Sequence, residues 1–347
     1  MAKRMLITGG CGFIGSNAAT YFLGKGYEVD VLDNFSRPGS EANREHLLAT
    51  HQNQPLTIIT LDIVTEAERL TKLVADRSYD VVLHTAAQVA VTTSVIDPML
   101  DFRSNALGTL NVLEAVRAGG KKPVVIYTST NKVYGGLEDY EVRDAGKRYE
   151  FVTIPEGVHE KVLLDFHSPY GCSKGSADQY VRDYSRIYGI PTIVFRQSCI
   201  YGAHQFGMVD QGWVAYLTMR ALFDKPITIY GDGKQVRDVL FMSDLARAYD
   251  AAIETAGENG GQIFNMGGGS KNTLSLLEFL EFLAPKLGKK IDYSFSDWRP
   301  GDQKVYVSDI AKAGQKLGWS PTVSFEQGFD EMLAWMMANK ELLSKYI

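Results

Sequence analysis

The turn Gly9-Gly10-Cys11-Gly12-Phe13-Ile14-Gly15 decides the fold, because it joins an apolar stretch at 4–8 to a helical stretch at 13–25. A second apolar stretch, at 27–33, follows directly. Glycines at the first turn of such a strand–helix–strand unit let backbone N–H groups and the helix N-terminus approach a pyrophosphate. We therefore predict a dinucleotide-binding unit. The residues expected to contact the cofactor in this turn are Gly9, Gly12, Phe13, Ile14 and Gly15.

The second strand of this unit ends in an acidic residue, Asp33. A carboxylate there can bind the ribose hydroxyls of adenosine, and it favours NAD because it would repel the 2′-phosphate of NADP. Arg37 lies nearby, but an Asn-Phe-Ser loop separates it from Asp33. Later strand ends are expected to hold the adenine and to let the cofactor lie close, although His84 and Gln88 fit ordinary loop packing equally well. These further cofactor candidates are Asn34, Asp62, Ile63, Ala86, Ala87 and Gln88.

Apolar strands and helices continue to alternate along the first half of the chain. Strands almost free of polar residues, separated by helices, predict an α/β fold with a Rossmann-type doubly wound parallel sheet. After residue 196 the alternation weakens, which predicts a smaller C-terminal α/β domain that binds substrate. We expect domains at 1–196 and 197–347, with some chain crossing back. The predicted strands are 56–62, 80–84, 123–129, 192–196 and 262–265, the last in the smaller domain, and the predicted helices include 64–77, 97–118 and 170–188.

Composition narrows the possible partners. The chain has 347 residues and a net charge of −5, which argues against a nucleic-acid or anionic-membrane partner. Its three cysteines, Cys11, Cys172 and Cys199, form no disulfide pattern, and no metal-ligand cluster appears. The sequence contains no apolar stretch of about 18 residues. These features predict a cytoplasmic protein without a metal.

Tyr170 and Lys174 are four residues apart, which on a helix places both side chains on one face. An ammonium one turn away would lower the pKa of the phenol and make it a better base. Ser168 is a suitable N-cap and Pro169 suits a first turn, so Tyr170 is expected at the exposed start of a helix. Such a pair alone is more often a coincidence on a surface. However, the hydroxyls of 128–130 end a predicted strand and should face the same crevice.

These motifs together resemble the extended short-chain dehydrogenase/reductase family, the NAD-dependent nucleotide-sugar epimerases and dehydratases. The resemblance covers nearly the whole chain. Within that family, the segments at 130–135, 164–175, 205–213 and 233–240 resemble the CDP-tyvelose (CDP-paratose) 2-epimerases. Cys199 departs from both patterns, because the broad family often has asparagine there and the tyvelose-type enzymes have serine. The matching motifs are 8–15, Asp33-Asn34, Asp62, 84–87, Asn105, 133–135, Tyr170 with Lys174, 201–202, 237–238 and 264–268.

The resemblance implies a role for each catalytic candidate. Tyr170 would take a proton from a sugar hydroxyl, Thr130 would hydrogen-bond the same hydroxyl, and Lys174 would hold the nicotinamide ribose. The reaction would be epimerisation of a nucleoside-diphosphate sugar by transient oxidation to a ketosugar and return of the hydride to the opposite face. Guanidinium groups could clamp the diphosphate. The substrate candidates are Ser129, Asn131, Lys132, His167, Cys199, Arg237 and Arg299.

Alternatives remain at this level. The runner-up is a 4-epimerase of a UDP- or CDP-hexose. A 4,6-dehydratase is disfavoured, because such enzymes carry Asp-Glu where this chain has Asn131-Lys132. A net-oxidising dehydrogenase or a dinucleotide-binding protein without turnover is also possible. The charged segment 138–161 is expected to cover the active site or to contact another subunit, and the family resemblance implies a homodimer or homotetramer.

Overall fold

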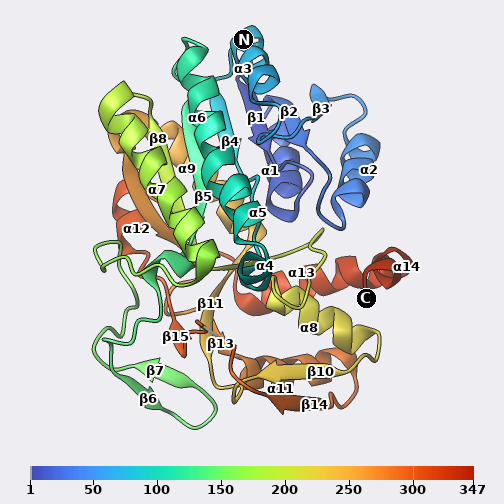
Figure 1. The fold of residues 1–347 in the computed structure, drawn as a ribbon. Coiled ribbons are helices and arrows are strands. Elements are labelled where there is room, and N and C mark those ends of the chain that lie inside the picture. Colours follow the sequence, from blue (N-terminus) through green and yellow to red (C-terminus); the bar gives the residue numbers. More distant parts are fainter. Residues whose placement is uncertain (1, 300) are drawn as a thin grey trace.

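The computed structural model describes residues 2–299 and 301–347, and a seven-stranded parallel sheet lies at its centre (Figure 1). The strand order is β12-β8-β5-β4-β1-β2-β3, so the direction of winding reverses between β1 and β4. The predicted doubly wound parallel sheet is confirmed. The strands are β1 Arg4–Thr8, β2 Glu28–Asp33, β3 Leu56–Thr60, β4 Val81–His84, β5 Val124–Thr130, β8 Thr192–Gln197 and β12 Gln262–Met266.

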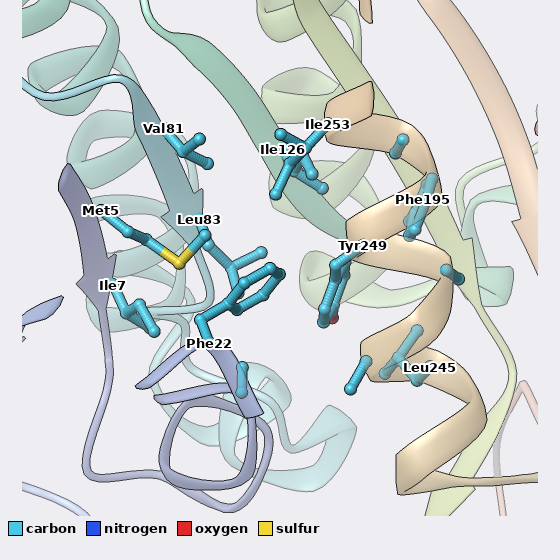
Figure 2. Close-up of a cluster of buried hydrophobic side chains, with 14 of the residues drawn as sticks. Met5, Ile7, Phe22, Val81, Leu83, Ile126, Phe195, Leu245, Tyr249 and Ile253 are labelled. Carbon is cyan, nitrogen blue, oxygen red and sulfur yellow. The ribbon is translucent and has the colours of Figure 1, made fainter. Parts of the chain in front are cut away.

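Helices cover both faces of this sheet, because each strand sends alternate apolar side chains to opposite sides. Figure 2 shows the first face, where Phe22 of α1 and Tyr249 of α9 meet Ile7 and Leu83 of the strands. On the other face, α3, α6 and α7 cover a second apolar cluster that includes Leu6. The helices are α1 Phe13–Gly24, α2 Ser40–Thr50, α3 Ala67–Arg77, α6 Gly108–Ala118, α7 Ser168–Tyr188 and α9 Met242–Glu254.

The predicted helix over 97–118 is confirmed with one local change. Residues 98–118 are helical throughout, as α5 Pro98–Phe102, a π-helical turn, Arg103–Leu107, and α6. A separate short helix, α4 Val91–Ile96, precedes this run. Asp97 separates α4 from α5, and its carboxylate accepts the backbone N–H of Leu100 at 2.9 Å. Pro98 follows at the first position of α5, where its missing N–H costs nothing. The helical period therefore marks the extent of this helix, and the π turn is the departure that it does not show.

The strand at 262–265 was assigned to the smaller domain, and that assignment is wrong. It forms β12 at the edge of the large sheet, parallel to β8, with Gln262 opposite Ile193. Leu245 of α9 and Leu317 of α12 Ala311–Leu317 also belong to the core on the first face. The chain thus returns to the large domain after residue 241, as α9 and β12. Some crossing back was expected, but periodicity could not show which segment does so, because strand neighbours are chosen by tertiary packing.

The remaining elements form a smaller lobe below the large sheet in Figure 1. In one of its sheets β11 pairs with β9, β13 and β15, and in another β10 pairs with β14. Phe279, Phe329 and Met332 are fully buried in the core of this lobe. Its elements are β9 Cys199–Tyr201, α8 Trp213–Leu222, β10 Ile227–Tyr230, β11 Val236–Phe241, β13 Thr273–Ser275, α11 Leu276–Leu287, β14 Tyr293–Ser296, β15 Val305–Tyr306, α13 Phe325–Ala338 and α14 Lys340–Leu343. The short helix α10 Ala256–Asn259 packs instead on the large domain, beside α9 and β8.

The charged segment at 138–161 forms a hairpin, β6 Val142–Asp144 and β7 Tyr149–Phe151, that packs against the smaller lobe. Lys234 pairs with Asp144 at 2.6 Å, and Arg148 donates to the hydroxyl of Thr273 at 2.6 Å. These polar contacts join a segment that leaves the large domain to the lobe opposite it. The hairpin therefore bridges the two lobes.

A buried ion pair fastens α7 to the large sheet. Two nitrogens of Arg196 donate to the two carboxylate oxygens of Asp178 at 2.9 and 3.0 Å, and both residues are at most 1% exposed. A third nitrogen of Arg196 donates to the hydroxyl of Tyr134, which in turn donates to Asn265 of β12. The network joins α7, β8, β12 and the 3₁₀ turn Asn131–Tyr134.

Among the described residues, the helices are too short or too polar to cross a membrane.

Removing one member of the pair formed by Asp178 and Arg196 should strongly destabilise the fold, because the other charge stays buried without a partner. We expect Asp178→Ala to lower the free energy of unfolding by about 3–5 kcal/mol. Asp76→Ala is the control, since Asp76 forms only an exposed pair with Lys72 and should leave stability unchanged within error. Urea unfolding measures both. Equal stability of the two variants would contradict the assigned importance of the buried pair.

Candidate active site

A cavity of about 650 Å³ lies between the carboxyl ends of the large sheet and the smaller lobe. Ligands of doubly wound sheets bind at this edge, beside the point where the strand order reverses. Phe13, Ala87 and Tyr170 line the cavity from the large domain, and Trp213 and Tyr230 line it from the smaller lobe. Among the described residues, no group of three or more His, Cys, Asp or Glu side chains could hold a metal ion.

The glycine turn has the geometry that a pyrophosphate requires. Gly9 has φ +65°, and a Cβ on it would lie 2.6 Å from the Cα of Ala86, so a larger residue does not fit. A Cβ on Gly15 would lie 2.5 Å from the Cα of Gly10. α1 begins after Gly12 without a side-chain cap, which leaves its first backbone N–H groups available to an anion. Phe13 and Ile14, which carry two of them, line the cavity.

Asp33 lies at the end of β2, as predicted, and is held by the backbone. Its carboxylate accepts the N–H groups of Cys11 at 2.9 Å and Phe35 at 2.8 Å. Burial raises the pKa of Asp33, and these N–H groups oppose the rise. The amide of Asn34 donates to Asp62 at 2.8 Å, which brings those two candidates together.

Arg37, which argued for NADP, does not extend toward Asp33. Its guanidinium donates to the side chain of Gln211 at 2.7 Å and acts electrostatically on Asp210 and Tyr170. The loop around these residues closes over the cavity, since Thr92 also donates to Asp210 at 2.8 Å. The arrangement leaves the carboxylate of Asp33 without a cationic partner among the contacts that the structure describes.

The candidates at 63 and 84–88 divide into cavity and packing residues. Ala87 lines the cavity, whereas the side chain of Ile63 belongs to the apolar core. The side chain of Gln88 turns inward and donates to the carbonyl of Ala90 and to Asp101. His84 lies between the hydroxyls of Thr8 and Thr109, and burial lowers its pKa to about 3. The packing interpretation therefore describes His84 and the side chain of Gln88.

The catalytic candidates lie together at the cavity wall. Thr130, Tyr170 and Lys174 all line the cavity, so the spacing on α7 places Tyr170 and Lys174 on one face as predicted. The helix starts at Ser168, whose hydroxyl accepts the N–H of Gly171 at 3.3 Å. The expected exposure of the Tyr170 ring is wrong, because the residue is only 8% exposed. The cavity reaches it from within the fold.

The electrostatics differ from the prediction at this pair. Burial raises the pKa of Tyr170 to about 12, and the hydroxyl of Thr130 only partly opposes this. Burial also lowers the pKa of Lys174 to about 7. The ammonium donates to the carbonyl of Thr128 at 2.6 Å and lies 4.3 Å from the ring centroid of Tyr127. The expectation of a lowered pKa for Tyr170 is therefore wrong for the protein without cofactor, because loss of solvent dominates and the cation that acts to lower this pKa is Arg37.

All seven substrate candidates line the cavity, but they differ in how free their polar atoms are. The hydroxyl of Ser129 donates to buried Asp178 at 2.9 Å, so its proton points into the fold. The amide of Asn131 accepts from Thr130 at 3.3 Å. Burial and the charge of Arg237 lower the pKa of Lys132 to about 8.

A cationic pair faces one carboxylate on the smaller-lobe side. Arg237 donates to Asp302 at 2.6 Å, and Lys132 lies 3.8 Å from the same oxygen. Although burial acts to raise it, these two cations lower the pKa of Asp302. Arg299 lies over the ring of Tyr230, 3.9 Å from its centroid. Pro300, the next residue in the chain, lies outside the described residues.

His167 and Cys199 complete the candidate set. A ring nitrogen of His167 lies 3.0 Å from Asp165, and burial raises the pKa of the Cys199 thiol. Sequence reasoning did not single out Asp302 and Gln235 as cavity residues, although Gln235 lies within the segment 233–240 that carries the resemblance and Asp302 follows Arg299 by three positions. The side-chain oxygen of Gln235 is buried and has no hydrogen-bond partner among the described residues, so a polar ligand could bind it.

Comparison with known proteins agrees with this geometry. The family described as GDP-mannose 4,6 dehydratase matches residues 6–332. A CDP-paratose 2-epimerase of Salmonella typhi is 44% identical over 337 residues, which cover 96% of this chain and 98% of the relative. A UDP-glucuronic acid 4-epimerase of Bacillus cereus, solved with UDP-glucuronic acid and NAD, is 31% identical with a TM-score of 0.82 and covers 96% of this chain and 99% of its own. A dTDP-glucose 4,6-dehydratase of Streptomyces venezuelae, solved with NAD, is 28% identical with a TM-score of 0.83 and covers 99% and 100% of the two chains.

The glycine turn supplies a test of the cofactor cradle. Gly9→Ala should cost about 1–2 kcal/mol from the left-handed backbone alone, and the clash with Ala86 should reduce dinucleotide affinity at least about tenfold. Gly24→Ala, at the end of α1, is the matched control, because an added Cβ there meets no atom within 4 Å. It should be neutral or stabilising by up to about 1 kcal/mol. Calorimetric titration with NAD and thermal unfolding measure both effects, and unchanged NAD affinity in Gly9→Ala would contradict the assignment.

Proposed function

The chain belongs to the GDP-mannose 4,6-dehydratase family of nucleotide-sugar epimerases and dehydratases, and from that premise we propose that it is an NAD-dependent epimerase of a nucleotide-activated sugar. The substrate that the comparisons favour is CDP-paratose, inverted at C2 to CDP-tyvelose. One observation carries the proposal: Tyr170, Thr130 and Lys174 line the cavity that also reaches the glycine turn at Phe13 and Ile14. A proton acceptor and a dinucleotide site thus face one space large enough for a sugar.

Tyr170 would accept the proton of the sugar hydroxyl that is oxidised, and Thr130 would orient that hydroxyl. When bound, NAD would supply the hydride acceptor for oxidation and return the hydride in the second half of the reaction. Because the pKa of Tyr170 is raised to about 12 in the protein alone, a nearby positive charge must favour the phenolate during proton transfer. In the protein alone, Arg37 is the cation that acts to lower the pKa of Tyr170. We propose that the ammonium of Lys174, one turn away on α7, holds the nicotinamide ribose and adds positive charge near the phenol.

Residues around the cavity would hold the rest of the substrate. Arg237 and Arg299 present guanidinium groups that suit the two phosphates. Lys132 and Asn131 would contact the sugar, and the free side-chain oxygen of Gln235 would accept a hydroxyl or amino group. Asn131-Lys132 also stand where dehydratases of the resembled family carry Asp-Glu, which supports inversion over loss of water. We propose the same roles for the other candidates: His167 and Cys199 toward the sugar, and Asp33 toward the adenosine ribose.

We further propose that the protein works as a homodimer or homotetramer in the cytoplasm. Exposed apolar side chains on α5 support self-association, since Met99 is 59% exposed and Phe102 is 51% exposed. Tyr180 and Ile187 of α7 are exposed as well. Sedimentation of the purified protein would show the assembly, and a monomer at micromolar concentration would exclude it.

The decisive experiment combines cofactor analysis with product analysis. Mass spectrometry of the freshly denatured protein should find NAD, and NMR of the protein with CDP- and UDP-hexoses in heavy water should find inversion at C2 of a CDP-sugar. No deuterium should enter the inverted carbon, because the hydride returns from the cofactor. Inversion at C4 would assign the protein to the 4-epimerases instead. Deuterium at the inverted carbon would exclude the oxidation–reduction route, and net NADH formation would indicate a dehydrogenase.

Tyr170→Phe removes the proton acceptor while keeping the ring. We expect the turnover number to fall by about 100- to 10,000-fold, with NAD still bound at the wild-type ratio. Tyr180→Phe is the control, because this tyrosine lies on the same helix and is 47% exposed. Epimerisation rates and NAD content measure the outcome. A Tyr170→Phe enzyme with near wild-type turnover would remove Tyr170 from the mechanism.

Asp33→Asn keeps an oxygen for the N–H of Cys11 but loses the charge. NAD affinity should fall by about tenfold, and the preference for NAD over NADP should narrow because the 2′-phosphate is no longer repelled. Fluorescence titration with NADH and NADPH measures both affinities. An unchanged affinity ratio would show that another residue contacts the ribose.

A further inference from the structure

A buried carboxylate outside the cavity joins three segments around the catalytic helix. Asp101 of α5 is fully buried, and all of its hydrogen-bond donors are neutral. One oxygen accepts from Gln88 at 2.9 Å and from Asn105 at 3.1 Å, and the other accepts from the hydroxyl of Ser173 at 2.5 Å. Ser173 immediately precedes Lys174 on α7. Asp101 therefore lies beside the catalytic lysine without belonging to the cavity wall.

The charge of Asp101 has no direct counter-ion among the described residues. Asp178, the other buried carboxylate near Lys174, is paired through both oxygens with Arg196. Burying an unpaired charge is expensive, so a carboxylate bonded only to neutral groups requires a cation nearby. Hydrogen bonds lower the cost for Asp101 but leave its charge uncompensated.

Lys174 presents the complementary situation. It is 2% exposed, its ammonium donates to the carbonyl of Thr128, and it forms no ion pair in the described part of the chain. The titratable groups facing it are Asp178 and Tyr170 on its own helix, Tyr127 on β5, His84 on β4 and Asp101 on α5.

Four of these five groups supply no free negative charge. Both tyrosines have a raised pKa and stay neutral, and the lowered pKa of His84 keeps its imidazole uncharged. Asp178 is neutralised by Arg196. Asp178, the larger carboxylate influence on Lys174, thus shares its charge with Arg196, whereas Asp101 has no cation bonded to it among the described residues.

We propose that Asp101 is the counter-charge that keeps Lys174 protonated, and is thereby a positioning residue for proton transfer at Tyr170. Its catalytic consequence rests on the proposed function, whereas the charge coupling does not. The π-helical turn after α5 supports the arrangement, because Asn105 within it donates to Asp101 and also lies 3.0 Å from the hydroxyl of Ser173. Such turns insert one extra residue into a helix and re-aim its side chains.

The pKa directions of Lys174 and Asp101 agree with this coupling, and the charge of Asp101 also acts to raise the pKa of Tyr170. Burial lowers the pKa of Lys174 to about 7, and Asp178 and Asp101 act to raise it. Burial raises the pKa of Asp101, and Ser173 and Lys174 act to lower it. Because Lys174 titrates near neutrality, even a modest counter-charge decides whether it is an ammonium at the working pH.

Asp101→Asn and Ser173→Ala separate the charge from the hydrogen bond. The first keeps the size of the side chain and removes the charge, and the second removes one bond and keeps the charge. The full-length protein with ¹³C-labelled lysine would be titrated by NMR with and without NAD, with the Lys174 signal identified by its absence in Lys174→Arg. We expect Asp101→Asn to lower the pKa of Lys174 by about one pH unit, and Ser173→Ala to lower it less, because the carboxylate of Asp101 stays but loses one hydrogen bond. The proposal is overturned by an unchanged pKa in Asp101→Asn, or by an equal change in Ser173→Ala.

Two further measurements test the proposal if Asp101→Asn does not fold or if epimerase activity is found. If Asp101→Asn does not fold, the ¹³C carboxyl signal of Asp101 in the wild-type protein decides, because a carboxyl still protonated at pH 7 could not be a counter-charge. If epimerase activity is found, the alkaline limb of its turnover number should move to lower pH in Asp101→Asn, since Lys174 would lose its proton earlier. Ser173→Ala should move that limb less than Asp101→Asn does. If no epimerase activity is found, the NMR titration still decides the charge coupling.

Discussion

The ion pair between Asp178 and Arg196 holds the catalytic helix against the sheet, and the geometry of the site depends on it. α7 carries Tyr170 and Lys174 at its start, and Asp178 lies one turn beyond Lys174. The same arginine reaches Tyr134, which ends the 3₁₀ turn that directly follows Thr130. A single buried network therefore sets the positions of all three catalytic candidates relative to β5 and β8. Because the ion pair is almost completely buried, it stabilises the fold only while both charges are present.

The second constraint is the way the chain divides between two lobes. Residues 242–254 and 262–266 return to the large domain as α9 and β12, while neighbouring segments build the smaller lobe. The cavity lies between the two lobes, so its wall combines glycine-turn residues with Arg237 and Trp213. The hairpin at 142–151 is joined to the smaller lobe by two ion pairs. This construction brings the glycine turn and the catalytic candidates to one cavity.

Burial governs the electrostatics of the site more than the spacing of its charged residues does. A lysine four residues after a tyrosine suggests a lowered phenol pKa, yet both groups lose solvent and both shift toward their neutral forms. The same loss of solvent makes Asp101 and Lys132 influential, since charges interact more strongly where water is excluded. The pKa values that these side chains have in water are therefore a poor guide to the acid–base behaviour of this cavity.

The sequence by itself determined the parallel sheet, the glycine turn, the acidic end of β2 and the shared face of Tyr170 and Lys174. These features follow from local periodicity, turn chemistry and spacing along one helix, which act over a few residues. Only the tertiary structure decided that β12 joins the large sheet, that a π turn lies inside the helix at 98–118, and that Asp101, Gln235 and Asp302 surround the site. Those outcomes depend on which distant segments pack together and on which groups lose water, and neither is encoded in any short stretch of the chain.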